Sequence, residues 1–207
     1  MTVREKNIKK VVKCALESFI EIGIEGSTVT DIARQAQLTE RSVFRYFETK
    51  QDLVLAAVLQ YWEYLKGYVS SETDNIISDE NILASEKIES VLKAYASIFF
   101  TNRKELIFIE EAEVYLYRAG KIDSLQEKRL LAGKGKTPLG DAIKKGILEG
   151  VIVEDEMLKV RYYNSFDALL GLLQKSAVLR GDNKEENEFI EERLRVFCRL
   201  LAYEFLK

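Results

Sequence analysis

The chain of 207 residues contains no histidine, only one proline and only two cysteines. Without histidine it can form neither a Ser-His or Cys-His nucleophile pair, nor an imidazole base, nor the common kinds of zinc site. Catalysis would have to rest on lysines or carboxylates, so we predict a protein that is not an enzyme and needs no metal and no cofactor. Cys14 and Cys198 lie near opposite ends of the chain within apolar helical patterns, which predicts two buried thiols and no disulfide.

The single proline, Pro138, and the abundance of Leu, Ile, Glu, Lys and Ala are typical of a protein built from long helices. With 47% hydrophobic residues the chain can bury a sizeable core, and we expect an all-α fold. No stretch approaches about 18 uncharged apolar residues, and no apolar segment follows the charged N-terminus. We therefore expect a soluble, cytoplasmic protein with no membrane partner.

Charge is distributed unevenly along the chain, whose net charge is −3. Residues 1–50 hold nine Lys or Arg against seven Asp or Glu, whereas the remainder holds 22 against 27. The N-terminal segment is thus basic and the rest acidic. The sign suits an N-terminal contact with nucleic acid, but the difference is small and needs support from sequence motifs.

The first fifty residues predict three helices. Apolar residues recur at helical spacing over 8–20, and Gly23 ends that run. Thr28, followed three residues later by an aspartate, predicts the N-cap of a short second helix that ends near residue 36. After a tight turn at 37–38, Thr39 predicts the N-cap of a third helix over 40–47. Two short helices joined by a tight turn form a helix-turn-helix, the hallmark of many DNA-binding proteins.

The third predicted helix has two different sides. Its apolar side holds Val43, Phe44 and Phe47, and its polar side holds Arg41, Ser42, Arg45 and Tyr46. The two arginines lie one turn apart, so both guanidinium groups could reach the O6 and N7 acceptors of guanine in a major groove. The hydroxyl groups of the polar side suit phosphate oxygens or base edges, and Lys50 could neutralise a phosphate. Taken alone, the pattern also fits any amphipathic surface helix.

The motifs of the wider sequence favour a DNA-binding helix over an ordinary amphipathic surface helix. Its motifs are Thr28-Val-Thr-Asp-Ile-Ala33, Ala36-Gln-Leu-Thr39, Ser42-Val-Phe-Arg-Tyr-Phe47 and Lys50-Gln-Asp-Leu53. In this order they resemble the DNA-binding domain of the TetR family of bacterial transcriptional regulators, and the resemblance covers about a quarter of the chain. It implies that Thr28, Thr39, Tyr46 and Lys50 fall on phosphate-contacting positions, and that Arg41, Ser42 and Arg45 belong to the recognition helix.

Two residues depart from the family pattern. The family usually has glycine where this chain has Gln37, and a glutamine in a left-handed turn costs on the order of 1 kcal/mol. We therefore expect a slightly different turn here. The family also often has tyrosine where this chain has Phe44, a position expected to face the core.

Residues 1–50 are predicted to form the DNA-binding domain and residues 51–207 a helical domain for ligand binding and dimerisation. A helix from residue 51 to 65 would join the two without a flexible linker, and the polar stretch 70–81 is predicted to be a loop. The predicted effector pocket comprises Trp62, Tyr95, Phe99, Phe108, Glu110, Glu113 and Tyr115. Its two carboxylates lie among apolar residues and would suit a cationic or amphipathic aromatic compound. The alternatives are an internal salt bridge or a solvated rim for the glutamates, and ordinary core packing for the aromatics.

Two long apolar-striped helices are predicted to finish the chain, over 157–180 and 188–206. The stripe predicted to form a four-helix bundle with a second copy comprises Phe166, Leu170, Leu173, Ala177, Leu194, Phe197 and Leu201. Internal core packing is the alternative for these residues. The resemblance favours a homodimer, which would read a palindromic operator with two recognition helices.

We therefore expect a repressor that binds double-stranded DNA and is released from its operator by a small-molecule effector of unknown identity. The alternative is a small-molecule or nucleotide-binding enzyme that merely contains a similar helix pair. The missing histidine counts against that alternative.

Overall fold

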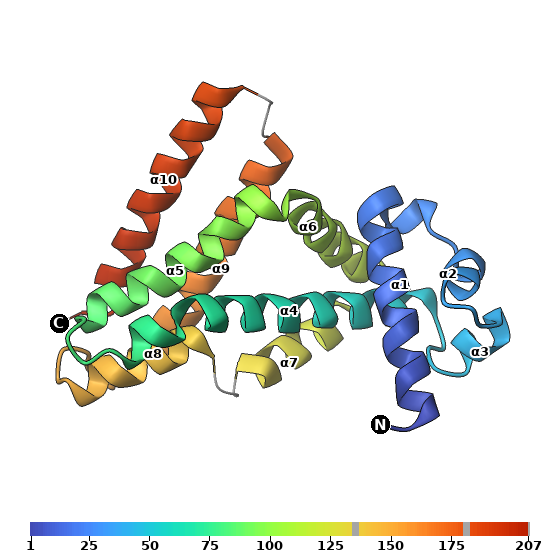
Figure 1. The fold of residues 1–207 in the computed structure, drawn as a ribbon, viewed down its shortest axis with the longest axis horizontal. Helices are drawn as coiled ribbons and strands as arrows, with labels where there is room; N and C mark the ends of the chain where they lie inside the picture. The colour runs from blue at the N-terminus through green and yellow to red at the C-terminus, as the bar shows by residue number, and fades with distance from the viewer. Residues whose placement is uncertain (134–136, 180–182, 207) are drawn as a thin grey trace. The chain divides into compact units, whose positions relative to one another are not determined.

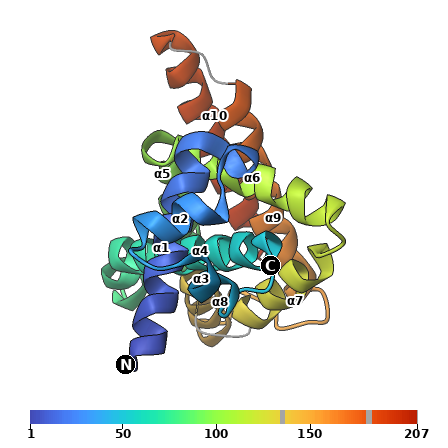
Figure 2. The ribbon, with the colours of Figure 1, turned by 90° about the vertical axis from the view of Figure 1, so that its right-hand side faces the viewer.

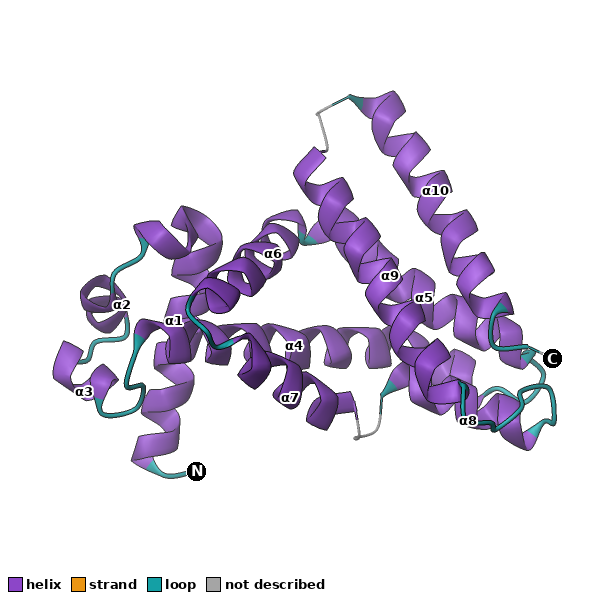
Figure 3. Cartoon of the chain, turned by 180° about the vertical axis from the view of Figure 1, so that it is seen from behind, coloured by secondary structure: helices purple, strands orange, loops and turns teal. Residues whose placement is uncertain are grey.

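The computed structural model describes residues 1–133, 137–179 and 183–206, and it describes their side chains except at residues 99 and 128–133. All regular structure in these residues is helical, so the predicted all-α fold is confirmed (Figure 3). No described helix is long and apolar enough to cross a membrane. The described helices are, in chain order (Figure 1), α1 (Val3–Gly26), α2 (Val29–Gln35), α3 (Glu40–Phe44), α4 (Lys50–Ser78), α5 (Ala84–Thr101), α6 (Arg103–Arg118), α7 (Ile122–Gly133), α8 (Pro138–Leu148), α9 (Leu158–Leu179) and α10 (Lys184–Tyr203).

The chain divides into two compact units. Unit 1 comprises Met1–Tyr64 and Lys104–Lys134, and unit 2 comprises Leu65–Arg103 and Gly135–Lys207. Helix α4 contributes its first half to unit 1 and its second half to unit 2, while α6 and α7 pack with the N-terminal helices. The functional boundary predicted at residue 50 stays a prediction.

Unit 1 has a core built on one face of α1, where Val11, Ala15 and Phe19 are buried. Figure 2 looks onto this unit, with α1, α2 and α3 in blue. Helices of seven and five residues are too short to be stable alone, so α2 and α3 depend on this packing. The ring of Phe19 stacks on Phe108 of α6 with centroids 6.0 Å apart, which fixes α6 against α1.

The predicted loop over residues 70–81 is wrong for most of its length, because α4 continues to Ser78. Val69, Thr73 and Ile77 recur every four residues and are all buried, which gives this polar stretch one interior face. The Thr73 hydroxyl donates to the Val69 carbonyl at 2.7 Å, so its burial leaves no unsatisfied donor. The sequence did not predict this buried face, because Thr73 stands where an apolar residue would have continued the apolar pattern.

Unit 2 is organised around α5, which packs against α8, α9 and α10. Lys87 of α5 is fully buried and its ammonium lies 3.1 Å from the Glu149 carboxylate at the end of α8. Cys198 of α10 is buried here and Cys14 is buried in unit 1, and both are free, which confirms the prediction of two buried thiols. Burial raises the pKa of the Cys198 thiol to about 12.

Candidate nucleic-acid interface

Side-chain caps define the start of both helices of the predicted helix-turn-helix, as expected. The Thr28 hydroxyl accepts a hydrogen bond from the Asp31 amide at 3.1 Å and caps α2. The Thr39 hydroxyl accepts from the Ser42 amide at 3.2 Å and caps α3. Each cap contributes about 1 kcal/mol to helices that have few internal hydrogen bonds of their own.

The turn between α2 and α3 is held by Gln37, whose backbone adopts φ 55°, the left-handed conformation that favours glycine. Its amide donates to the Arg34 carbonyl at 3.0 Å, and the Leu38 amide donates to the Ala33 carbonyl at 2.9 Å. The Gln37 side chain accepts a hydrogen bond from the Lys10 ammonium at 3.0 Å. The turn thus keeps a left-handed geometry although the residue there is not glycine.

Helix α3 ends at Phe44, three residues earlier than predicted. The chain stays in a near-helical path, because the amides of Tyr46 and Phe47 both donate to the Val43 carbonyl, at 2.8 and 2.9 Å. Arg45 itself keeps right-handed helical backbone angles. Arg41 and Arg45 are consequently both exposed on the same end of unit 1.

Phe44 does not face the core, contrary to the sequence-based expectation: 43% of its surface is exposed. A helix of five residues buries only a narrow arc here, centred on Val43, and Phe44 projects 100° further round. Phe44 therefore belongs to the exposed side with Arg41 and Arg45.

Tyr46 lies at the centre of a small cationic cluster. Its hydroxyl oxygen accepts hydrogen bonds from Asn7 and Arg45, both at 3.4 Å, and these bonds hold the pKa of the hydroxyl below its ordinary value. The guanidinium groups of Arg45 and Arg4 lie 5.4 and 5.9 Å from the ring centroid. Because the oxygen already accepts two bonds, its own O–H is left to donate outward, as a contact with phosphate requires.

The remaining predicted contact residues differ in what they can offer. The Thr28 hydroxyl donates to the Asp31 carboxylate at 2.6 Å, so it can donate to phosphate only if that bond opens. The hydroxyls of Thr39 and Ser42 share one hydrogen bond at 2.9 Å, which leaves one O–H between them for an outside acceptor. Lys50 begins α4 and is half-buried; burial lowers its pKa more than the nearby Glu25 raises it.

The residues of the predicted effector pocket fall in both units. Phe108 is buried in unit 1, and Trp62, Glu110, Glu113 and Tyr115 are half-buried there. The Oε2 atom of Glu110 is buried without a hydrogen-bond partner among the described residues, whereas Glu113 is engaged within the chain. In unit 2, Tyr95 is buried edge-on against Phe166, and the side chain of Phe99 lies outside the described residues.

Four residues of the predicted dimer stripe are buried within unit 2: Leu170, Leu173, Ala177 and Leu194. Their burial fits internal core packing, the alternative to a dimer interface. Phe166, Phe197 and Leu201 are half-buried. The large apolar side chains that α10 leaves exposed are Phe189, Val196, Leu200 and Tyr203. Both sets recur at helical spacing, so periodicity alone could not tell the inner stripe from the outer one.

Comparisons with known proteins agree with this geometry. Residues 11–57 match the model of bacterial regulatory proteins of the tetR family. The chain is 22% identical over 156 residues to the transposon Tn10 TetC protein of Escherichia coli, covering 68% of this chain and 76% of that protein.

Two solved structures share the whole fold. One, assigned to the TetR family of transcriptional regulators, comes from Mesorhizobium loti and has a TM-score of 0.73 at 16% identity, with both chains fully covered. The other is Thermus thermophilus FadR, a TetR-family transcriptional repressor in complex with lauroyl-CoA, with a TM-score of 0.68 at 18% identity, covering 97% of this chain and 95% of that one. Residues 11–57 thus match the tetR family of bacterial regulatory proteins, and the described helices share their fold with these two solved structures.

Proposed function

We propose that this regulator binds double-stranded DNA as a homodimer and represses transcription until a small molecule releases it. The observation that carries the proposal is the polar strip of a capped helix-turn-helix, in which Arg41 and Arg45 are exposed and Ser42, Tyr46 and the neighbouring Lys50 are half-buried. Exposed arginines one helical turn apart match the spacing of acceptors along the major groove. An enzyme that merely contains such a pair would have no need for this arrangement.

The residues of the strip would have different tasks. Arg41 and Arg45 would read guanines through bidentate hydrogen bonds, and the exposed side chain of Phe44 beside Arg41 suits the methyl group of a thymine. Tyr46 and Lys50 would contact phosphates and so position the helix. Thr28, Thr39 and Ser42 would contribute further phosphate contacts through hydroxyl protons that are not engaged in hydrogen bonds at the helix caps.

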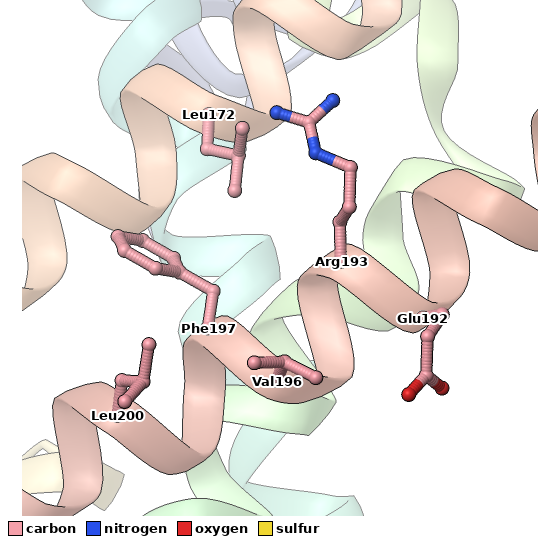
Figure 4. Close-up of a pocket in the computed structure, with 6 residues that line it drawn as sticks. All are labelled: Leu172, Glu192, Arg193, Val196, Phe197 and Leu200. Atoms are coloured by element: carbon pink, nitrogen blue, oxygen red, sulfur yellow. The ribbon is translucent and has the colours of Figure 1, made fainter.

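A homodimer is supported by the exposed apolar face of α10. Leu172 of α9 and Phe197 of α10 line a shallow apolar groove on this face (Figure 4), in which Phe197 and Arg193 point toward α9 and Glu192 points away. Apolar side chains that remain exposed along a whole helix are typical of an interface. A two-fold dimer would present its recognition helices to half-sites about 34 Å apart, one turn of DNA.

A charged substitution on the exposed face of α10 tests the proposed dimer. Leu200 is 61% exposed on α10, so Leu200→Glu should leave the fold intact but place two glutamates in the interface. We expect a monomer by analytical ultracentrifugation and loss of operator binding. The matched control is Leu148→Glu on α8. Leu148 is 83% exposed, and this variant should stay dimeric. A Leu200→Glu protein that remains dimeric contradicts this surface.

Effector binding is proposed for the predicted pocket residues that lie in unit 1, namely Trp62, Phe108, Glu110, Glu113 and Tyr115. Two buried polar atoms in unit 1, the Tyr61 hydroxyl and Glu110 Oε2, have no hydrogen-bond partner among the described residues. Unsatisfied buried polar atoms are costly, and a ligand with its own polar groups could satisfy them. Because the Thermus thermophilus relative holds lauroyl-CoA, that compound is the first to test. Trp62, the only tryptophan, provides the fluorescence signal.

Movement caused by an effector would reach the recognition helix through α6, which is fastened to the N-terminal helices at both ends. Lys104 pairs with Glu21 of α1 at 3.0 Å. Three residues beyond the other end, the Lys121 ammonium donates to the carboxylate of Asp52, which itself accepts from the Thr49 amide just before α4. A shift of α6 would therefore pull on α1 and on the start of α4, immediately after the recognition helix.

The experiment that tests the proposal is selection of an operator from random duplexes, followed by titration of the purified protein at several salt concentrations. We expect a palindromic sequence bound at least about a thousandfold more tightly than random DNA. An effector should quench Trp62 and weaken operator binding by the reciprocal amount. Affinity without a preferred sequence would contradict the proposal.

A further inference from the structure

The N-terminal half of α1 carries more positive charge than the recognition helix. Residues 1–13 hold five basic residues, Arg4, Lys6, Lys9, Lys10 and Lys13, against a single acidic one. That acidic residue, Glu5, is occupied in a capping box with Thr2, whose amide donates to its carboxylate at 2.8 Å. The basic side chains of this half-helix are exposed.

Three residues of this segment, at positions 4, 7 and 10, touch the helix-turn-helix. Arg4 lies over one side of the Tyr46 ring, 5.9 Å from its centroid, and Asn7 donates to the Tyr46 hydroxyl at 3.4 Å. Lys10 donates to the side chain of Gln37 in the turn between α2 and α3 at 3.0 Å. This edge of α1 therefore runs from the end of the recognition helix to the turn before it, within one compact unit.

Neither Arg4 nor Lys10 is neutralised by a carboxylate in the described part of the chain. The Arg4 guanidinium lies over the Tyr46 ring, 5.9 Å from its centroid, and Lys10 donates one of its three protons to a neutral amide. Lys13, one turn further along, is different because it pairs with Glu17 at 3.8 Å. Two uncompensated cations thus flank the proposed base-reading residues.

We propose that Arg4 and Lys10 form a second DNA-binding element, the α1 strip, which neutralises phosphates on the backbone beside the groove that α3 enters. The inference rests on the proposed DNA binding and adds residues outside the matched segment 11–57. Such contacts carry no sequence information, because every nucleotide offers the same phosphate. The α1 strip would therefore set affinity and salt dependence, while α3 sets sequence preference.

The test is the salt dependence of DNA binding, measured by fluorescence anisotropy with the full chain. Each lost phosphate contact makes the negative slope of log K against log salt shallower by about 0.9. For a dimer that loses one contact per protomer, the slope should become shallower by roughly 2. We expect that change for Arg4→Ala and for Lys10→Ala, with the same fold loss on operator and random duplexes. Lys13→Ala is the matched control and should keep the wild-type slope.

Arg4→Lys separates the positive charge from the shape of the guanidinium over the Tyr46 ring, because it keeps the cation and should retain most of the slope. If the double variant Arg4→Ala/Lys10→Ala, folded by circular dichroism, keeps the wild-type slope, the α1 strip is refuted while DNA binding stands. If the wild type binds random DNA without sequence preference, the proposed regulator fails, yet the slopes still decide the α1 strip. No DNA binding at any salt concentration overturns both.

Discussion

Gln37 offers a quantitative test of the turn geometry. Its φ of 55° is a conformation that costs a non-glycine residue about 1–2 kcal/mol. Glycine avoids that cost but loses more backbone entropy on folding, about 0.5–1 kcal/mol. The hydrogen bond from Lys10 is exposed and contributes little. Gln37→Gly should therefore raise the free energy of unfolding by about 0.5–1 kcal/mol, the difference between these two effects.

Urea denaturation followed by circular dichroism at a fixed protein concentration measures this change. Gln37→Ala is the control, since it loses the Lys10 hydrogen bond but keeps the left-handed backbone, and it should be no more stable than wild type. Stabilisation by glycine alone assigns the effect to the backbone. A glycine variant that is less stable than wild type would refute the strain argument.

Three further predictions concern stability and accessibility. Because hydrogen bonds from Lys121 and Thr49 outweigh burial and lower the pKa of Asp52, its contribution is present above about pH 4 and lost as the pH falls. Asp52→Asn should thus cost about 1 kcal/mol in urea denaturation at pH 7 and little near pH 3. Gly146→Ala should destabilise by about 1–3 kcal/mol, because its Cβ would overlap Ile152, whereas Gly67→Ala, whose Cβ meets nothing, should stabilise slightly. Thiol reagents should label the two cysteines only in denaturant, and rapid native labelling would contradict their burial.

The helix-turn-helix could be predicted from sequence because its signals are local. Thr28 and Thr39 cap helices through hydroxyl groups three residues from their targets, and such caps depend little on the rest of the fold. The turn is also a local feature, so the sequence alone showed that Gln37 stands where the family usually has glycine. The structure gives that residue a left-handed backbone with a φ of 55°.

The misjudged features all depend on long-range packing. Val69 and Ile77 reveal that residues 70–78 are helical only when their burial is known. Phe44 is exposed because a five-residue helix presents one narrow arc to a small core, which a helical wheel cannot determine. On α10, the buried Leu194 and the exposed Leu200 belong to stripes of equal periodicity, and only the position of α5 distinguishes them.

One titration tests most directly whether Arg41 of α3 and Arg45, the residue that follows α3, read DNA bases. Wild type, Arg41→Ala and Arg45→Ala are each titrated against the selected operator and against the same duplex with the contacted guanines replaced. We expect each alanine to cost about 1–3 kcal/mol of binding free energy on the operator and nothing on the duplex that lacks its guanine. Equal losses on both duplexes would contradict base reading by these arginines.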